Sequence, residues 1–535
     1  MASRIISIFY RFDEVELKVL RVLHGARDLE TMLDLKRLGN DMNYFDQAKT
    51  HASRRTFLAR GGVGAIALGT LMHRDVGRAS PSDNKSSASS PSGRDARPTI
   101  HRGLPGLPHH APRIKRVIHL YMAGGPSHLE TFDFKPKLAE LSGQLMPASV
   151  TTGQPIAQLQ DERQLFALGP QFKFTRCGQS GQLISELFPH LGSIADDLCI
   201  IRSMHTDAIN HDPAHTLMNT GTTISGRPSI GAWVWYGLGS AADDLPGFVV
   251  LAATLPGRSP QPISTRMWHS GFLPGQFQGV ELRSKGDPVL YLNNPSGVTS
   301  DLQRDVLNAA QQLNRKHEEA SGDPEVAVRI QQYELAFKMQ TSVPELMDIR
   351  NEPQHVRDLY GVSGPDGSFA YLCLLARRLA ERGVRFIQVY LRDWDHHDGL
   401  NRYLPQNARA ADQASAALVK DLKQRGMFDD TLIVWGGEFG RTPMAQTNKG
   451  PAGRDHHMKG YSLWLAGGGI RGGLTYGATD DLGYHATENR VHVNDLHATM
   501  LHLLGVDHLR LTSRFQGRDF RLTDVAGEVV RGVLR

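Results

Sequence analysis

Histidine and acidic side chains concentrate in a few short segments of this 535-residue sequence. Four such segments are His205–His215, Asp393–Asp398, Glu438–Arg441 and Arg454–His457. Carboxylates and imidazoles are the groups that bind divalent metal ions and that transfer protons in hydrolysis. The four segments therefore indicate metal chemistry, provided that the fold brings them together.

The candidate metal ligands share carboxylate or imidazole donors and lie in the last three segments: Asp393, Asp395, His397, Glu438, Asp455 and His456. Such donors suit zinc, manganese or iron and, with fewer histidines, magnesium or calcium. Asp393 and His397 have a DxxxH spacing, which allows both side chains to reach one ion from a turn. A second interpretation stays open, in which the loops form hydrogen-bonded networks without an ion and His396 and His457 are solvated.

The elements around these segments must place them at one edge of a sheet. Short apolar runs predict strands over residues 113–122, 198–203, 248–252, 384–391, 431–435 and 461–466. Helical spacing predicts helices over residues 183–195, 368–382 and 408–425. This alternation is typical of an α/β fold, a doubly wound and mainly parallel sheet flanked by helices. Ligands bind such sheets at the carboxyl ends of the strands, where the polar segments fall, so we expect one shared site.

Two further helical segments show no evident chemistry. Residues 301–347 are mostly helical in pattern, with a break at Asp323-Pro324, and predict a helical insertion over about residues 300–347. The helix expected over residues 494–504 places leucine and methionine on one face. We expect that face to pack in the core, with His497 and His502 exposed.

The N-terminal region, residues 1–78, has the layout of an export leader. Its core, residues 53–72, places Arg54-Arg55 directly before a short, glycine-rich apolar stretch, as in twin-arginine signals. Twelve apolar or small residues are too few to cross a bilayer core of about 30 Å, so no permanent membrane span is expected. The twin-arginine translocation machinery would deliver the protein to the periplasm or the extracellular space. A buried helix with a chance arginine pair stays open, as does the true start, Met1 or Met42.

Composition limits the possible partners of the chain. Residues 79–112, rich in Ser, Pro, Asp and Gly at their start, predict a disordered linker before an α/β domain at residues 113–535. Residues 1–97 hold 16 Lys and Arg against 11 Asp and Glu, whereas the remainder holds 44 of each. The body is therefore neutral and lacks the basic surface of a nucleic-acid binder. Its three cysteines, Cys177, Cys199 and Cys373, fit buried free thiols, although one disulfide stays open.

Several motifs of the body resemble one known family. They are Gly124–Asp133, Asn210–His215 with Thr220-Gly221, Gly226–Gly231, Trp394–His397, Glu438–Pro443 and Gly453–His456. With them the chain from about Arg113 to Leu534 resembles the bacterial family known as domain of unknown function 1501, which is grouped with alkaline phosphatases and sulfatases. The resemblance implies an alkaline phosphatase-like fold with a divalent metal ion at the strand ends and a phosphate ester, sulfate ester or polysaccharide as substrate.

The chain departs from the sulfatase pattern at three places. Where sulfatases have Ser-Asp-His-Gly, residues 437–440 read Gly-Glu-Phe-Gly, so that Glu438 could replace a ligand but Phe439 could not. The paired aspartates after the first strand correspond to Gly124 and Gly125, which leaves three possible substitutes: His128, Glu130 and Asp133. The nucleophilic Cys or Ser corresponds to His211, so no formylglycine can form there.

Two functions are compatible with this pattern. In the first, the protein is an exported metal-dependent hydrolase of phosphate or sulfate esters, in which the ion activates water or His211. Asp212 would orient the ring of His211, and a protonated His215 would hold the anion below about pH 6.5. In the second, the protein keeps the fold without turnover and acts as an exported binding or cell-surface protein.

Overall fold

The computed structural model describes residues 6–12 and 17–24 and most of residues 101–535. The gaps within the latter range are residues 160–163, 254, 256–262, 284–287, 290–293, 295–298, 300, 306, 310–311, 313–323 and 448–449. The predicted twin-arginine core at residues 53–72 lies outside the described residues. Contacts divide the chain into two compact units, Met1–Ala88 with Pro295–Thr299 and Ser89–Asn294 with Ser300–Arg535. In the first unit, β1 (Ile6–Phe12) pairs with β2 (Leu17–His24) in antiparallel fashion.

The second unit is built on a nine-stranded sheet with the order β14-β6-β13-β10-β3-β9-β7-β8 and β17 beside β6. Its strands are β3 (Arg116–Met122), β6 (Leu198–His205), β7 (Phe248–Ala252), β8 (Val280–Leu282), β9 (Phe386–Leu391), β10 (Thr431–Gly436), β13 (Tyr461–Gly467), β14 (Leu474–Tyr476) and β17 (Val491–His492). All pairings in the sheet are parallel except those of β13 with β10 and with β6. The predicted mainly parallel sheet is confirmed, and each of the six predicted strands is present.

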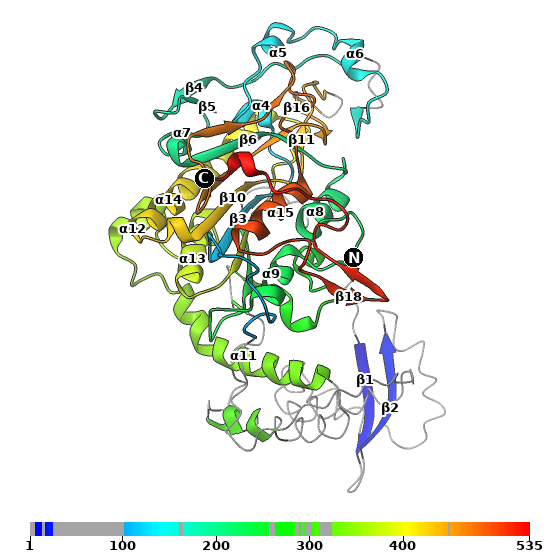
Figure 1. Ribbon diagram of the computed structural model, residues 1–535, viewed down its shortest axis with the longest axis vertical. Helices are drawn as coiled ribbons and strands as arrows, with labels where there is room; N and C mark the ends of the chain where they lie inside the picture. The colour runs from blue at the N-terminus through cyan, green and yellow to red at the C-terminus, as the bar shows by residue number, and fades with distance from the viewer. Residues whose placement is uncertain are drawn as a thin grey trace, which may run out of the picture. The chain divides into compact units, whose positions relative to one another are not determined.

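Both faces of the sheet are buried, because alternate side chains of each strand enter different cores. In β3, Ile118 and Leu120 join one core, whereas Val117 and Tyr121 join the other. The first core contains side chains of α7 (Pro189–Gly192), α11 (Pro324–Met347), α12 (Gln354–Tyr360), α13 (Phe369–Glu381) and α14 (Leu400–Gln424). The second contains side chains of α8 (His211–Thr220), α9 (Ile230–Leu238) and α15 (Val493–Leu503). Figure 1 shows α12–α14 on one side of the central strands and α8, α9 and α15 on the other, which is the doubly wound arrangement.

Short elements complete the unit around this sheet. The small helices are α4 (His128–Thr131), α5 (Pro136–Glu140) and α6 (Ala148–Thr151). The small hairpins are β4 (Phe174–Cys177) with β5 (Gln182–Ser185), β11 (Gly440–Arg441) with β12 (His456–His457), β15 (Ala478–Thr479) with β16 (Ala486–Glu488), and β18 (Ser513–Phe515) with β19 (Arg518–Phe520). Among the described residues, five 3₁₀ turns add to these: Ala195–Asp197, Thr265–Trp268, Gly275–Phe277, Phe428–Asp430 and Arg531–Val533.

Strand β13 is antiparallel because no helix connects it to β10. The connection is a loop that contains the β11–β12 hairpin, and a parallel neighbour would require a longer crossover. The N-terminal end of β13 therefore lies at the edge where the parallel strands have their carboxyl ends. His456 and His457, which precede β13, reach that edge for this reason.

Some predicted elements differ from the structure. The helix expected over residues 183–195 was wrong at its start, where β5 lies, because Pro189 confines the helical turn to α7. Helix α14 begins at Leu400, eight residues before the predicted start at residue 408, since Leu400 and Leu404 extend its buried face. In α15, His497 is fully buried and Nε2 donates to the Met218 carbonyl, so its predicted exposure was wrong.

The end of the predicted linker is also part of the folded unit. Leu104 N donates to the Gly237 carbonyl, His101 Nε2 donates to the Tyr236 carbonyl, and Asp507 N donates to His109 Nδ1. The disordered linker expected over residues 79–112 is therefore too long at its C-terminal end. All three cysteines are free thiols, as expected, although Cys177 is only half-buried. Among the described residues, no helix has the length and apolar character needed to span a bilayer.

Candidate metal site

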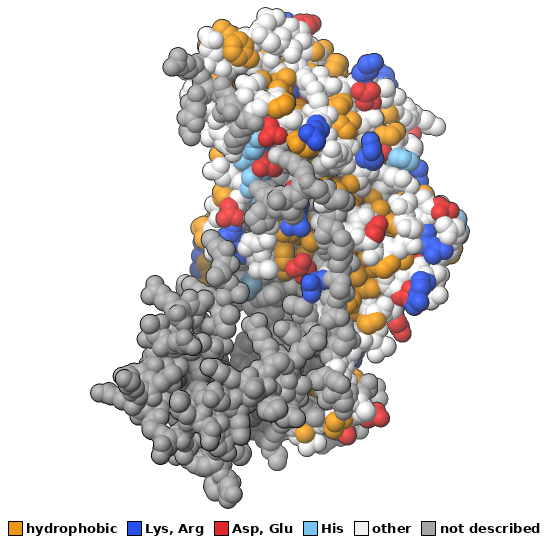
Figure 2. Space-filling model, turned by 180° about the vertical axis from the view of Figure 1, so that it is seen from behind, with side chains coloured by type: hydrophobic (Ala, Val, Ile, Leu, Met, Phe, Trp, Pro, Cys, Tyr) orange, Lys and Arg blue, Asp and Glu red, His pale blue; other side chains and the backbone are white. Residues whose placement is uncertain are grey.

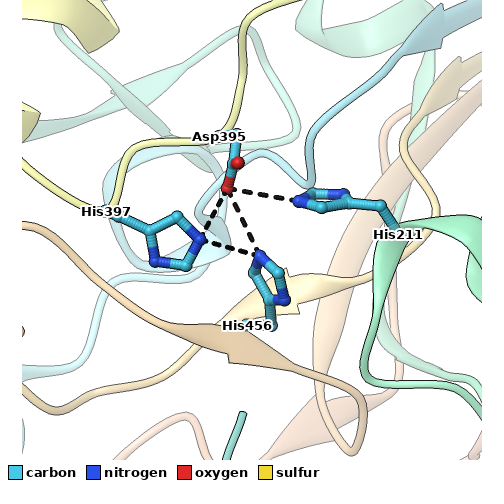
Figure 3. Close-up of side chains that lie close together, drawn as sticks. All are labelled: His211, Asp395, His397 and His456. Atoms are coloured by element: carbon cyan, nitrogen blue, oxygen red, sulfur yellow. Dashed lines mark hydrogen bonds and ion pairs between the residues drawn. The ribbon is translucent and has the colours of Figure 1, made fainter. Parts of the chain in front are cut away.

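Three of the four polar segments, one of them through the start of α8, supply side chains that converge at the carboxyl edge of the sheet. His211 is the first residue of α8, after the loop that leaves β6. Asp395 and His397 follow β9, and His456 lies on β12. Figure 3 shows the three imidazole rings arranged around the Asp395 carboxylate.

The four side chains meet at one oxygen atom. Asp395 Oδ1 lies 2.9 Å from His397 Nε2, 3.2 Å from His211 Nε2 and 3.3 Å from His456 Nε2. The Nε2 atoms of His397 and His456 are 2.8 Å apart. One donor atom from each of the four residues lies within 4.8 Å of all the others, so the group could hold a metal ion. We call these four residues the metal cluster.

The second nitrogen of each ring is fixed by an oxygen acceptor. Nδ1 of His397 donates to Gln446 Oε1 at 2.6 Å, and Nδ1 of His456 donates to the Ile209 carbonyl at 3.0 Å. Nδ1 of His211 donates to Glu438 Oε1 at 2.7 Å. In a neutral ring that donates through Nδ1, Nε2 carries a lone pair. Three lone pairs therefore face one carboxylate, an arrangement that a cation would satisfy and that second-shell acceptors maintain in metal sites.

Charge at the cluster is governed by Asp395 and by Arg441, whose Nη2 lies 2.7 Å from Asp395 Oδ1. Burial by itself raises the pKa of Asp395, but Arg441 and the three histidines outweigh it and hold that pKa far below its usual range. Burial lowers the pKa of His456 to about 4. Burial also opposes protonation of His211, yet the carboxylates of Asp395 and Glu438 raise its pKa.

Glu438 is not one of the four cluster residues, but it contacts the cluster through the ring of His211. Its side chain is fully buried, and Oε1 accepts hydrogen bonds from His211 Nδ1 and from the Gly124 amide at 3.0 Å. His215 Nε2 lies 3.5 Å from the same oxygen, so that His211, His215 and Glu438 form a second close group. Burial raises the pKa of Glu438, but the two histidines outweigh it and lower that pKa, so the carboxylate is ionised.

The structure places four other candidate residues outside the metal cluster. Asp455 accepts backbone hydrogen bonds from Gln158, Leu159 and His456. Asp393 is buried with a φ of 77° and belongs to neither close group. The Asp212 side chain is 73% exposed and forms an ion pair with Arg266.

His215 is the fourth of these residues, and it lies behind His211. Nδ1 shares a 2.8 Å hydrogen bond with the Tyr121 hydroxyl, and the side chain is almost completely buried. Burial lowers the pKa of His215 despite the nearby Glu438. The ring is therefore neutral and enclosed, which is unsuitable for gripping an anion.

The second interpretation, without an ion, placed His396 and His457 in solvent, but both are buried. His457 Nε2 donates to the Tyr484 carbonyl, and burial lowers its pKa to about 3. The sequence interpretation also missed Gln446 and the Ile209 carbonyl, which orient two of the rings. No sequence signal identifies them, because they are single acceptors in loops. Arg441 could have been found as the only cation in the Glu438–Arg441 segment.

The three proposed substitutes for the paired aspartates lie away from the cluster. His128 Nε2 donates to the Gly483 carbonyl, Glu130 pairs with Arg454, and Asp133 pairs with Lys135. A side chain at Gly124 itself is excluded, because a Cβ there would lie 2.6 Å from the Asp395 amide nitrogen and φ is +119°. The backbone that carries Asp395 thus occupies the space of the missing carboxylate.

The fold and the site define an α/β protein with a three-histidine, one-aspartate cluster at the carboxyl edge of its sheet. The chain belongs to the family described as "Protein of unknown function (DUF1501)", whose profile matches residues 114–534. No curated protein matches the chain.

Similar solved structures include three enzymes. The lipoteichoic acid synthase LtaP from Listeria monocytogenes is 10% identical, with a TM-score of 0.34, over 82% of this chain and 80% of that one. The PsFucS1 sulfatase from Pseudoalteromonas sp. is 12% identical, with a TM-score of 0.30, over 78% and 72%. The alkaline phosphatase from the Antarctic bacterium TAB5 is 11% identical, with a TM-score of 0.28, over 74% and 98%. Likenesses this distant bear on neither activity nor substrate.

Proposed function

We propose that this protein is an exported metal-dependent hydrolase of phosphate or sulfate esters, with one ion bound by the metal cluster. The observation that carries the proposal is the convergence of Nε2 from His211, His397 and His456 on Asp395 Oδ1. Three imidazoles and a carboxylate favour zinc, manganese or iron, whereas magnesium and calcium prefer oxygen donors. A bound ion of this kind would polarise an ester oxygen and lower the pKa of water to about 7.

The chain's own residues would hold the site in one geometry. Glu438, Gln446 and the Ile209 carbonyl fix the three rings through Nδ1. Arg441 keeps Asp395 ionised. The ring of Phe439 lies against His211 and His456, with centroids 4.8 and 4.7 Å away, and excludes water from that side. Phe439, which cannot ligate, therefore has a packing role.

His211 is a ligand in this proposal and not the nucleophile. Nδ1 is bonded to Glu438, and Nε2 faces the cluster, so neither nitrogen is available to attack an ester. Water would instead form the new bond to phosphorus or sulfur, while the bond to the ester oxygen breaks and that oxygen takes up a proton. Asp212 points to Arg266 and not to the His211 ring, so it has no orienting role here.

Export is the second part of the proposal and rests on Arg54-Arg55 and the apolar stretch up to Met72. A metal centre that must be complete before transport suits the twin-arginine route, because that machinery carries folded cargo. Replacing both arginines with lysine should keep the protein in the cytoplasm, as measured by cell fractionation. Finding the double variant in the periplasm or in the medium would contradict the proposed export route but not the proposed hydrolase activity.

The test of the catalytic proposal uses the purified full chain. We expect it to retain about one transition-metal ion per chain after desalting and to hydrolyse members of aryl phosphate or aryl sulfate panels. Chelation should abolish turnover, and adding metal should restore it. A chain that retains no metal contradicts the proposal. A metal-loaded chain without turnover on either panel would favour the alternative, a non-catalytic exported binding protein.

A further inference from the structure

A second polar feature lies at the other end of α8. The helix starts at His211 in the metal cluster and ends at Thr220, which spans about 14 Å at 1.5 Å per residue. Beyond Thr220 lies a small, open pocket. Its lining includes two arginines and one hydroxyl residue that the metal site does not use: Arg227, Arg521 and Thr222.

The pocket is built by close packing between distant segments. A Cβ on Gly221, whose φ is +75°, would overlap the Leu522 carbonyl oxygen, so only glycine allows the C-terminal segment to approach α8. Gly271 lies similarly close to the backbone of Arg227 and Pro228. The Thr220-Gly221 and Gly226–Gly231 motifs noted in the sequence therefore form this pocket.

Positive charge dominates the pocket. The guanidinium of Arg227 lies over the Phe520 ring, 3.9 Å from its centroid. Arg521 donates through Nε to the Asp524 carbonyl. Asp524 also lines the pocket, and its carboxylate is paired with Arg518. Among the described residues, neither Arg227 nor Arg521 forms an ion pair with a carboxylate, and two such guanidinium groups suit an oxyanion such as sulfate, phosphate or carboxylate.

Aromatic rings lie beside the arginines. Phe272 stacks on Phe515 with centroids 5.0 Å apart and contacts Phe520 at 5.3 Å. Phe515 is 39% exposed, although large apolar side chains usually avoid solvent. The β18–β19 hairpin therefore places a partly exposed aromatic ring next to the cationic pocket. This combination suits a ligand that has both apolar ring faces and negative groups.

One chain segment, which begins at Arg266, contacts the start of α8 and also reaches the pocket. Arg266 pairs with Asp212 in the first turn of α8, next to His211. The segment after Arg266 reaches the pocket wall, where the Ser229 amide donates to the His269 carbonyl at 3.1 Å. A ligand at both ends of α8 must be extended and must carry more than one negative group, as a repeating anionic polymer does.

We propose that the pocket formed by Arg227 and Arg521 at the C-terminal end of α8 is a subsite for an anionic polysaccharide whose other end reaches the metal cluster. The reach to the metal cluster rests on the proposed function, whereas binding in the pocket does not. A polysaccharide fits better than a nucleic acid, because the body carries as many acidic as basic residues. The uncovered surface in Figure 2 likewise shows Lys and Arg interspersed with Asp and Glu.

The test measures binding of fluorescent dextran sulfate to the full chain in buffer with EDTA, with neutral dextran as the reference. We expect binding of dextran sulfate only, about tenfold weaker in Arg227→Gln and weaker still when Arg521→Gln is added. Arg514→Gln is the matched control, since Arg514 lies on the same hairpin but pairs with Asp519. It should change the affinity by less than about twofold.

Three outcomes would overturn the inference: no binding of dextran sulfate, unchanged affinity in Arg227→Gln, or tighter binding of single-stranded DNA than of dextran sulfate. Phe515→Ser, at an exposed position, provides a second test if the double variant fails to fold, and it should weaken binding several-fold. Unchanged affinity in Phe515→Ser would contradict the role of the aromatic rings. Binding in EDTA does not need the ion, so the two proposals fail separately: a metal-loaded chain that binds dextran sulfate but hydrolyses no ester would contradict the proposed function and support the subsite.

Discussion

Two pairs of adjacent histidines have different surroundings although all four rings are buried. His397 and His456 donate through Nδ1 and direct Nε2 to Asp395. His457, next to His456, uses Nε2 for the Tyr484 carbonyl instead. On a strand, adjacent side chains point to opposite faces, so β12 can send only one of its two histidines to the cluster. Burial alone therefore does not make a ligand; the decisive feature is which nitrogen already has a partner.

The largest expected effect is on metal affinity, and it differs between the two histidines of each adjacent pair. Replacing His397 or His456 with Phe keeps a ring but removes a lone pair from the cluster, and metal affinity should fall by more than about 100-fold. The same change at His396 or His457 should lower stability but leave about one ion per chain. Metal analysis after desalting and the metal-induced shift in melting temperature measure both effects. Equal metal loss in all four variants would contradict the assignment.

The sequence predicted the convergence but not the division of roles. The strand pattern was sufficient to bring Asp395, His397 and His456 to one edge, because parallel strands share their carboxyl ends. His456 was named as a candidate ligand and His457 was not, but the strand pattern gives no reason for this choice, because the register of the β11–β12 hairpin decides which of the two faces the cluster. Asp455 satisfies backbone amides for the same local reason.

Pairings over long sequence distances explain the other differences. Glu438 was expected among the metal ligands, and the structure places it beside the metal cluster, in the group with His211 and His215 that could also hold an ion. The Gly124 amide and His211 Nδ1 hold it there, and both lie more than 200 residues from it. The buried His497 depends on the Met218 carbonyl of α8, which no periodicity within residues 494–504 reveals. Local sequence patterns were thus sufficient to predict the strands. The hydrogen-bond partners of individual side chains depend instead on residues that are distant in the sequence.

Core histidines that are not ligands should make the folded state sensitive to acid. Burial lowers the pKa of His119 to about 3 and that of His497 to about 4. The unfolded chain protonates these rings near pH 6.5 and the folded chain only at much lower pH, so stability falls as pH decreases below about 6.5. From pH 6.5 to pH 5 each ring should remove about 2 kcal/mol from the free energy of unfolding.

Urea unfolding in EDTA at the two pH values measures this loss. In His119→Leu the loss should be smaller by about 2 kcal/mol, because one buried protonation site is gone. His355 is exposed on α12, and His355→Gln provides the control. If the free energy of unfolding fell by the same amount in His119→Leu and in the parent, His119 would have the same pKa in the folded and the unfolded chain.

A smaller effect is expected behind the His211 ring. Glu438→Gln keeps the shape but removes the charge that orients Nδ1 of His211, so metal affinity should fall by about 10- to 100-fold. Asp212→Asn is the matched control, because Asp212 is adjacent to His211 in sequence but pairs with Arg266. Isothermal titration with zinc measures both affinities. If the Asp212 variant lost as much affinity as the Glu438 variant, helix-wide disturbance rather than ring orientation would be responsible.

The smallest effect should occur at Gln446, where a neutral amide performs for His397 what the Glu438 carboxylate performs for His211. A neutral acceptor polarises the ring less than a carboxylate does, so its loss should cost less. Gln446→Leu removes the acceptor at 2.6 Å and should weaken zinc binding by about tenfold. Gln446→Glu restores an acceptor at the same position and should bind zinc at least as tightly as the parent. A purely structural role for Gln446 predicts the reverse order, because a buried carboxylate near Asp455 would disturb packing more than leucine does.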